Sequence, residues 1–216
     1  MIRKIEILKN ITDVGVVAVV RGDNAEMAEK TAEACIKGGI SPIEMTFTVP
    51  GADKVISNLK SKFSFEELVV GAGTVLDSET ARIAILAGAQ FIVSPAFSLE
   101  TAKLCNRYEI PYIPGCMTVK EIITAMEAGS DVIKVFPGAA FGPSIIKDFK
   151  APIPQASFMP SGGVSLDNVG EWIKNGCVAV STGGSLTAGA KTGDYNKVTE
   201  TAKLFVEKVK DARENS

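Results

Sequence analysis

Two charged residues occur where the sequence otherwise reads as buried β-strand. Lys134 lies in the middle of residues 132–136 (VIKVF), and Glu44 lies near the start of residues 43–48 (IEMTFT). Lysine and glutamate are rarely buried unless they are paired or functional. Side chains alternate between the two faces of a strand, so each charge lies on the face opposite its aliphatic neighbours. If both strands belong to one closed sheet, Lys134 and Glu44 face the same interior.

An amine and a carboxylate in one apolar interior can carry out a defined chemistry. Burial disfavours the protonated amine, and a neutral lysine attacks ketones to form a Schiff base. The iminium then accepts electrons from a neighbouring carbon–carbon bond, while the carboxylate moves the protons. The alternative is a buried ion pair that only fixes packing, because desolvation of both charges opposes their attraction. We favour catalysis by Lys134 and Glu44.

The composition excludes several other chemistries. The chain has no histidine, which rules out histidine-based triads and zinc sites built on imidazole ligands. Its four cysteines form no CxxC pair and are expected to be free thiols of a cytoplasmic protein. The net charge is -2, without the basic stripe that nucleic acid requires, and no apolar run is long enough to span a membrane.

Further polar residues follow the predicted strands. Arg21 follows the first strand, and its guanidinium could clamp a substrate carboxylate with two hydrogen bonds; the alternative is a salt bridge at the rim. Thr74 ends the third strand and could donate to the same carboxylate; the alternative is a helix N-cap.

Paired glycines follow the last two predicted strands. Ser161-Gly162-Gly163 comes after the seventh strand, and Gly184-Ser185 comes after the eighth. The backbone N–H groups of such loops hold phosphate in many α/β barrels, and glycine lets the anion approach closely. The alternative is a pair of tight turns. The phosphate interpretation fits several phosphosugar isomerases and synthases as well, so these glycines do not identify a reaction.

The elements that must position these residues form a regular alternation. Eight β-branched runs are predicted as strands, at residues 15–20, 43–48, 68–74, 91–94, 112–114, 132–136, 157–160 and 178–181. Helices are predicted at residues 2–10, 25–37, 78–87, 118–128, 165–175 and 195–213, with Ser78 as one N-cap and Thr118–Glu121 as a capping box.

This alternation predicts a single (β/α)₈ TIM barrel over residues 1–216, with an extra N-terminal helix before the first strand. The runner-up is an open, doubly wound sheet. A GxGxxG fingerprint after the first strand would favour the open sheet, but residues 20–24 read VRGDN.

Taken in order, these motifs resemble the 2-keto-3-deoxy-6-phosphogluconate and 2-keto-4-hydroxyglutarate aldolases over nearly the whole chain. The matching segments are IEMTFT (43–48), GAGTV (71–75), FIVSP (91–95), IPG (113–115), IKVFP (133–137), SGGV (161–164) and GS (184–185). The resemblance implies a class I aldolase that needs no metal or other cofactor. It implies a Schiff base on Lys134, an acid/base role for Glu44, pyruvate near Thr74 and Pro95, and a homotrimer.

The same resemblance implies phosphate binding by the two glycine loops, and it leaves the carboxylate contact open. Some members carry an arginine at the position of Thr48, and that arginine holds the carboxylate; here Arg21 resembles an arginine on the first strand of other members. We therefore expect the carboxylate near Arg21 and Thr48. Two other functions stay open: a phosphosugar isomerase or epimerase with Glu44 as the base, and a non-catalytic phosphosugar-binding barrel.

Overall fold

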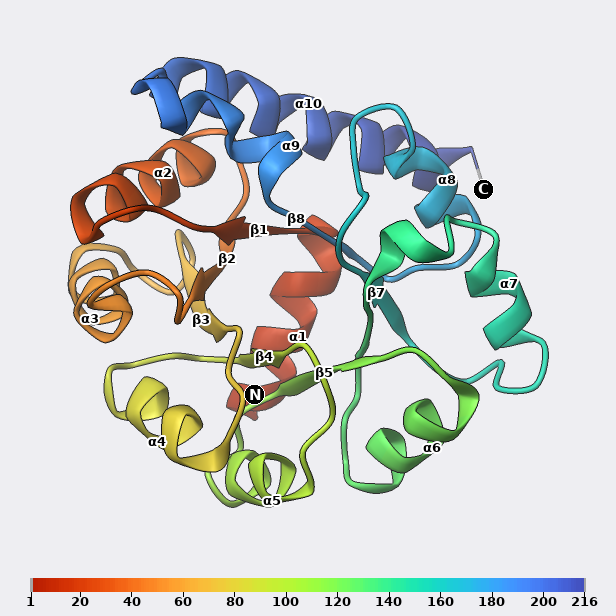
Figure 1. The fold of residues 1–216 in the computed structure, drawn as a ribbon. Helices are drawn as coiled ribbons and strands as arrows, with labels where there is room; N and C mark the ends of the chain where they lie inside the picture. The colour runs from red at the N-terminus through yellow and green to blue at the C-terminus, as the bar shows by residue number, and fades with distance from the viewer. Residues whose placement is uncertain (1, 216) are drawn as a thin grey trace.

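Eight parallel strands form one sheet in the structure, a computed structural model that describes residues 2–215. The strands are β1 (Val16–Val20), β2 (Pro42–Thr46), β3 (Val69–Gly73), β4 (Ile92–Ser94), β5 (Tyr112–Cys116), β6 (Ile133–Val135), β7 (Phe158–Pro160) and β8 (Val180–Thr182). Their order is β7-β6-β5-β4-β3-β2-β1-β8, and a parallel bridge between Ser161 and Ser181 joins the two ends of the sheet. The predicted barrel is therefore confirmed, and the open sheet is wrong (Figure 1).

Helices surround the barrel on its outside (Figure 1). They are α2 (Ala25–Lys37), α3 (Ala52–Lys62), α4 (Ser78–Leu86), α5 (Leu99–Arg107), α6 (Val119–Glu127), α7 (Ile145–Lys150), α8 (Val169–Lys174), the short α9 (Gly184–Thr187) and α10 (Tyr195–Glu214). Two 3₁₀ turns, η1 (Gly138–Ala140) and η2 (Ala188–Thr192), follow β6 and α9. No helix within residues 2–215 is long and apolar enough to cross a membrane.

Local hydrogen bonds explain where the helices begin. The capping box of α6 is confirmed, since the Thr118 side chain accepts from the Glu121 N–H and the Glu121 side chain accepts in return. The predicted cap at Ser78 is wrong: Asp77 precedes α4, and its carboxylate accepts from the Thr80 N–H at 2.6 Å. An aspartate accepts this bond as an anion near the positive end of the helix, which stabilises the first turn.

The apolar side chains form two layers that follow the alternation along the strands. The layer between strands and helices contains Ile43 and Met45 of β2 with Ile133 and Val135 of β6. The layer inside the barrel is smaller and consists of Val17, Val69, Phe91, Val93, Ile113, Val132, Met159 and Ala179. Residues adjacent in sequence to Glu44 and Lys134 thus lie outside the barrel, as the alternation predicted.

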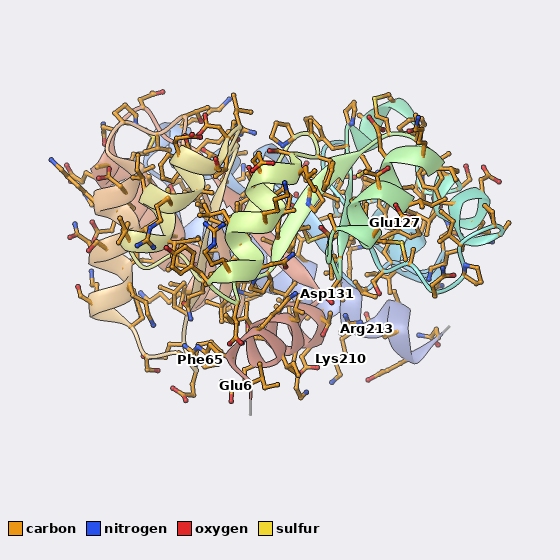
Figure 2. All side chains as sticks on the ribbon, turned by 90° about the horizontal axis from the view of Figure 1, so that it is seen from below. Glu6, Phe65, Glu127, Asp131, Lys210 and Arg213 are labelled. Atoms are coloured by element: carbon orange, nitrogen blue, oxygen red, sulfur yellow. The ribbon has the colours of Figure 1, made fainter. Side chains whose placement is uncertain are left out.

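Helix α1 (Arg3–Val14) closes the N-terminal end of the barrel. Its Ile7 and Ile11, at most 1% exposed, belong to the interior layer. In the side view of Figure 2 this helix lies across the lower end, with Glu6 on its solvent side. The predicted extra helix is therefore present, and it is a plug that keeps water from the lower half of the barrel.

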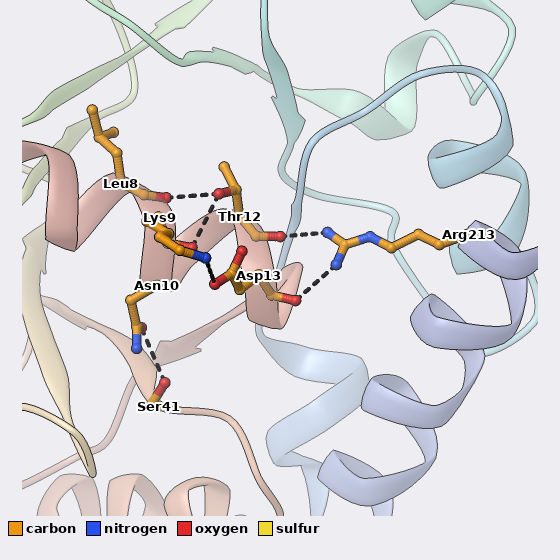
Figure 3. Close-up of polar contacts among 7 residues, drawn as sticks. All are labelled: Leu8, Lys9, Asn10, Thr12, Asp13, Ser41 and Arg213. Carbon is orange, nitrogen blue, oxygen red and sulfur yellow. Dashed lines mark hydrogen bonds and ion pairs between the residues drawn. The ribbon is translucent and has the colours of Figure 1, made fainter.

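The last turn of α10 fastens this plug (Figure 3). The Arg213 guanidinium donates to the carbonyl oxygens of Thr12 at 2.5 Å and Asp13 at 2.7 Å, and to that of Val178 at 2.9 Å. These carbonyls include two at the C-terminal end of α1, where no further helical N–H is present to satisfy them. Gly15, at φ 72°, leaves room for the guanidinium, because a Cβ there would lie 2.5 Å from Nη2.

Candidate active site

The structure brings Lys134 and Glu44 together in the upper half of the barrel interior. The Lys134 Nζ lies 3.9 Å from the Glu44 Oε1, and the two side chains are 7% and 1% exposed. The Phe136 ring also faces the amine, with its centroid 4.9 Å from Nζ. An amine so placed has apolar surroundings, one carboxylate and an aromatic face, which is the setting that the sequence predicted.

Glycine on β3 makes the space for the carboxylate. A Cβ at Gly73 would lie 2.0 Å from the Glu44 Oε1, so any larger residue there would displace Glu44. Gly71, on the same face of β3, similarly leaves room for the Phe91 ring, 2.5 Å from where its Cβ would lie. Sequence reasoning missed Gly73, although two glycines spaced two residues apart within a strand indicate that a neighbour approaches closely.

Ser181 of β8 is a second residue that sequence reasoning missed. Its hydroxyl is fully buried and donates to the Glu44 Oε2 at 3.4 Å. The signal was present in the alternation, because Ser181 lies two residues after the interior Ala179 and so faces the same interior. Its nearness to Glu44 depends on the closure that puts β8 beside β1, and β1 beside β2.

The cysteine thiols are poor candidates for a competing nucleophile. All four cysteines are free and buried. Burial raises the pKa of the Cys35 and Cys116 thiols to about 12, and the same cause raises that of Cys105 to about 12 despite the nearby Lys4. Since the thiolate is the reactive form, these side chains stay unreactive at neutral pH. The buried amine of Lys134 is therefore the candidate nucleophile of the interior.

Arg21 and Thr48 lie at the mouth of the barrel, above β1 and β2. Both are exposed, and no other residue of the range 2–215 forms an ion pair or a side-chain hydrogen bond with Arg21. The rim salt bridge considered for Arg21 is thus not observed. Thr48 lies just beyond β2, which ends at Thr46 instead of continuing to residue 48. Its hydroxyl lies 3.0 Å from that of Thr46, which donates to the Val20 carbonyl at 3.0 Å.

Thr74 follows β3 in a strained conformation. Its φ is 57°, a left-handed value that is unfavourable for a β-branched residue. Because Asp77 caps α4, the N-cap considered for Thr74 is wrong. Strain of this kind concentrates at functional sites, where the fold holds a side chain in a required direction.

Pro95 lies in the tight loop that joins β4 to α5. Its carbonyl oxygen would be 2.2 Å from a Cβ at Gly115, so the loop presses directly on β5. The Tyr112 hydroxyl fixes the same loop, because it lies 2.7 Å from the Ser94 hydroxyl and accepts from the Ser98 N–H at 3.1 Å. The position of Pro95 is therefore determined by β5, the strand next to that of Lys134.

The two glycine loops lie side by side at the ends of β7 and β8. Gly162 and Gly163 have φ values of 84° and 75°, and a Cβ at Gly163 would lie 2.8 Å from the Ala139 Cα. Gly184 has no neighbour within 4 Å of the place where its Cβ would be. Within residues 2–215, the backbone N–H groups of Gly162, Gly163, Gly184 and Ser185 donate to no protein acceptor. Ser161, by contrast, is buried at the bridge that closes the barrel.

Comparison with known proteins shows the family of this chain. The sequence profile of the family described as KDPG and KHG aldolase matches residues 7–201. The chain belongs to this family. It is 35% identical to the 2-dehydro-3-deoxy-phosphogluconate aldolase of Treponema pallidum, over 90% of this chain and 93% of the relative. It is 30% identical to the 2-dehydro-3-deoxy-6-phosphogalactonate aldolase of Escherichia coli, over 93% and 97% of the two chains.

Solved structures also superimpose on this aldolase. The KDPG aldolase of Legionella pneumophila, with pyruvate captured as a covalent carbinolamine, matches with a TM-score of 0.81 and 30% identity, covering 88% of this chain and 93% of that one. A cube-shaped protein cage, designed by fusing symmetric oligomeric domains, matches with a TM-score of 0.86 and 30% identity, covering 93% and 74%.

Proposed function

We propose that this aldolase cleaves 2-keto-3-deoxy-6-phosphogluconate to pyruvate and glyceraldehyde 3-phosphate through a Schiff base on Lys134. It acts in the same way on 2-keto-4-hydroxyglutarate, which yields pyruvate and glyoxylate. The observation that carries the proposal is the buried pair itself, an amine 3.9 Å from a carboxylate inside the barrel of a family member. The carbinolamine captured in the Legionella relative supports the covalent step.

The first half of the reaction makes the electron sink. The Lys134 amine attacks the keto carbon of the substrate, and the resulting carbinolamine loses water to give an iminium. Glu44 takes up and returns the protons that these steps release and require. The Glu44 Oε1 faces the Lys134 Nζ, so this oxygen is placed to exchange protons at the attacking nitrogen.

The second half breaks the carbon–carbon bond. Glu44 removes the proton of the C4 hydroxyl, and the C3–C4 electrons flow into the iminium, which releases the aldehyde and leaves an enamine on Lys134. The proton held by Glu44 then passes to C3, and water hydrolyses the pyruvate iminium to restore the amine. Every proton that leaves the substrate in this sequence is returned to it or to water.

The remaining residues of the site hold the two ends of the substrate. Arg21, which is exposed and unpaired within the described chain, binds the carboxylate together with the hydroxyls of Thr48 and Thr74, and Pro95 packs against the pyruvate moiety. The phosphate is bound by the backbone N–H groups of the two glycine loops, at residues 161–163 and 184–185. Unsatisfied N–H groups are good anion ligands because they point outward with a partial positive charge.

We also propose that the protein forms a homotrimer through the face made by helices α4, α5 and α6. These helices are neighbours around the barrel (Figure 1). The exposed apolar side chains of this face and of the loops before it are Leu76, Ile83, Leu86, Leu99, Met117, Val119 and Ile123. Apolar groups gathered on one face mark interaction sites in soluble proteins. The match to a cage built from symmetric oligomeric domains supports an oligomer.

The experiment that tests the activity measures pyruvate release from three substrates: 2-keto-3-deoxy-6-phosphogluconate, its galactonate epimer and 2-keto-4-hydroxyglutarate. We expect cleavage of the gluconate compound and loss of that activity in Lys134→Ala. The unphosphorylated hydroxyglutarate should depend far less on the glycine loops, so Gly184→Val should raise KM for the phosphorylated substrate alone. Binding of the sugar phosphate without pyruvate release would favour the non-catalytic barrel, and its isomerisation would favour the isomerase.

The trimer is tested by light scattering of the eluted protein. We expect three times the 22.7 kDa mass of the chain, and one chain mass for Leu86→Glu. The matched control is Leu204→Glu, since Leu204 is the one exposed large apolar residue that the described part of α10 carries. Dissociation by the Leu204 variant, or a wild-type monomer, would contradict the proposed interface.

A further inference from the structure

The carboxylate of Glu44 has two oxygens with different neighbours. Oε1 faces the Lys134 amine at 3.9 Å, whereas Oε2 accepts from the Ser181 hydroxyl at 3.4 Å. Ser181 is 0% exposed and Glu44 is 1% exposed. Within residues 2–215 these are the only ion-pair and hydrogen-bond partners of the Glu44 side chain, and Glu44 is the only partner of the Ser181 hydroxyl.

The strand register explains why these two residues meet. In the parallel sheet Val19 of β1 pairs with Glu44 on one side, and Val17 of β1 pairs with Ser181 on the other. The side chains of Ser181 and Glu44 therefore reach toward each other across β1 from the two strands that flank it. Gly73, on the strand beyond, leaves the space that Oε1 occupies.

We propose that Ser181 is a positioning residue for Glu44, an inference that rests on the proposed aldolase function. By holding Oε2, the serine hydroxyl turns Oε1 toward the amine and toward the carbon that gains and loses protons. A hydroxyl can donate to the carboxylate and, after rotation, accept from the carboxylic acid. The contact thus survives both states of a group that takes up a proton in one step and returns it in another.

The experiment uses pyruvate alone, because pyruvate lacks the phosphate and isolates the chemistry of the enamine. We would follow exchange of the methyl protons for deuterium in D₂O by NMR, for wild type, Ser181→Ala and Ser181→Cys. Loss of orientation of a single proton-transfer group should lower kcat for exchange by about tenfold in both variants, with KM for pyruvate changed by less than about twofold. Cysteine keeps the volume but is a weak donor, so it separates the hydrogen bond from packing.

Thr182→Val is the matched control. Thr182 is the next residue of β8 and is 2% exposed, and its hydroxyl donates to the Val164 carbonyl at 3.3 Å, away from Glu44. The control loses one buried hydrogen bond, so it reports the effect of a less stable strand. We expect its exchange rate to stay within about twofold of wild type.

A double-mutant cycle sharpens the result. The cycle compares the rate of borohydride-trapped adduct formation in all four proteins. Ser181→Ala should slow this rate where Glu44 is present and change it by less than about twofold in a Glu44→Gln background, because the group it positions is gone. If the exchange rates of Ser181→Ala and Ser181→Cys equal that of wild type, this inference alone is overturned. It is also overturned if Thr182→Val loses as much of the exchange rate as the Ser181 variants do. A folded wild type that neither exchanges nor forms an adduct would overturn the proposed function, and this inference with it.

Discussion

The two ends of this barrel are built from the same eight strands, yet they differ in every property that matters for function. At the N-terminal end, Ile7 and Ile11 of α1 complete an apolar layer, and Arg213 fastens the plug. At the C-terminal end, Lys134 and Glu44 replace apolar residues, and glycine loops leave N–H groups without a protein acceptor within residues 2–215. The N-terminal end therefore stabilises the fold. The C-terminal end keeps buried charges and unsatisfied N–H groups that destabilise the free protein and that a bound substrate satisfies.

The largest effect should come from replacing the buried pair by apolar residues. We expect Lys134→Met combined with Glu44→Leu to lose cleavage by more than about 10⁴-fold, since the proposed nucleophile and the proposed acid/base are both removed. Stability should be equal to wild type or higher by about 1–4 kcal/mol, because two desolvated charges have been removed. Urea unfolding and the pyruvate-release assay measure both properties. A clearly less stable double variant would show that the pair is structural.

At the plug we expect the opposite outcome, a loss of stability without a loss of activity. Ile11→Ala should lower the free energy of unfolding by about 2–4 kcal/mol, because Ile11 is fully buried and leaves a cavity. The activity of the folded fraction should not change, since the plug lies at the far end of the barrel. Ile5→Ala on the same helix is the control; Ile5 is 49% exposed, and its loss should cost less than about 0.5 kcal/mol. A fall in kcat for Ile11→Ala would break the separation of the two ends.

A smaller effect is expected at Arg213, the residue that fastens the plug. Arg213→Ala should lower the free energy of unfolding by about 1–2 kcal/mol, because three carbonyls lose a charged donor but stay near solvent. Lys210 lies on the same helix, 3.9 Å from Glu214 on the surface, so Lys210→Ala is the control and should be nearly neutral (Figure 2). Equal unfolding midpoints for Arg213→Ala and wild type would show that these hydrogen bonds of Arg213 contribute nothing to stability.

The smallest effect compares two strained residues at opposite ends. Thr74, after β3, and Glu109, in the loop before β5, have φ values of 57° and 54°. Glycine at either position should raise stability by about 1 kcal/mol, because it adopts this conformation without strain. Thr74→Gly should also lose about tenfold in kcat/KM, because the proposed hydroxyl donor to the substrate carboxylate is removed, whereas Glu109→Gly should not. Thermal unfolding measures the stability of both variants, and steady-state kinetics measures their kcat/KM. Unchanged kinetics for Thr74→Gly would show that Thr74 is not part of the site.

Alternation along single strands was enough to predict the barrel and the convergence of Lys134 with Glu44. Alternation could not predict contacts that depend on which strands become neighbours in the sheet. Ser181 reaches Glu44 only because the closed barrel sets β8 beside β1. The exposed apolar residues of α4, α5 and α6 were also not predicted. In the sequence, Ile83 and Leu86 look like ordinary core positions of an amphipathic helix.

Some expectations from the sequence stay predictions. The carboxylate contacts of Arg21 and Thr48 are among them, because an exposed side chain at a barrel mouth has no fixed partner until a substrate arrives. The organisation of residues 1–216 as one domain and the cytoplasmic location are others. The strand ends also shifted, since β2 stops at Thr46 where the chain turns, and no propensity in 43–48 marks that turn.

The central claim is that the Lys134 amine forms a covalent adduct with pyruvate inside the barrel. The most direct test is borohydride reduction of the folded protein with pyruvate, followed by mass mapping of its peptides. We predict one reduced adduct on the peptide that carries Lys134, none in Lys134→Arg, and none on Lys150, a half-buried lysine whose ammonium bonds the Ala156 carbonyl. An adduct confined to other lysines, or no adduct on folded protein that still releases pyruvate, would contradict the account.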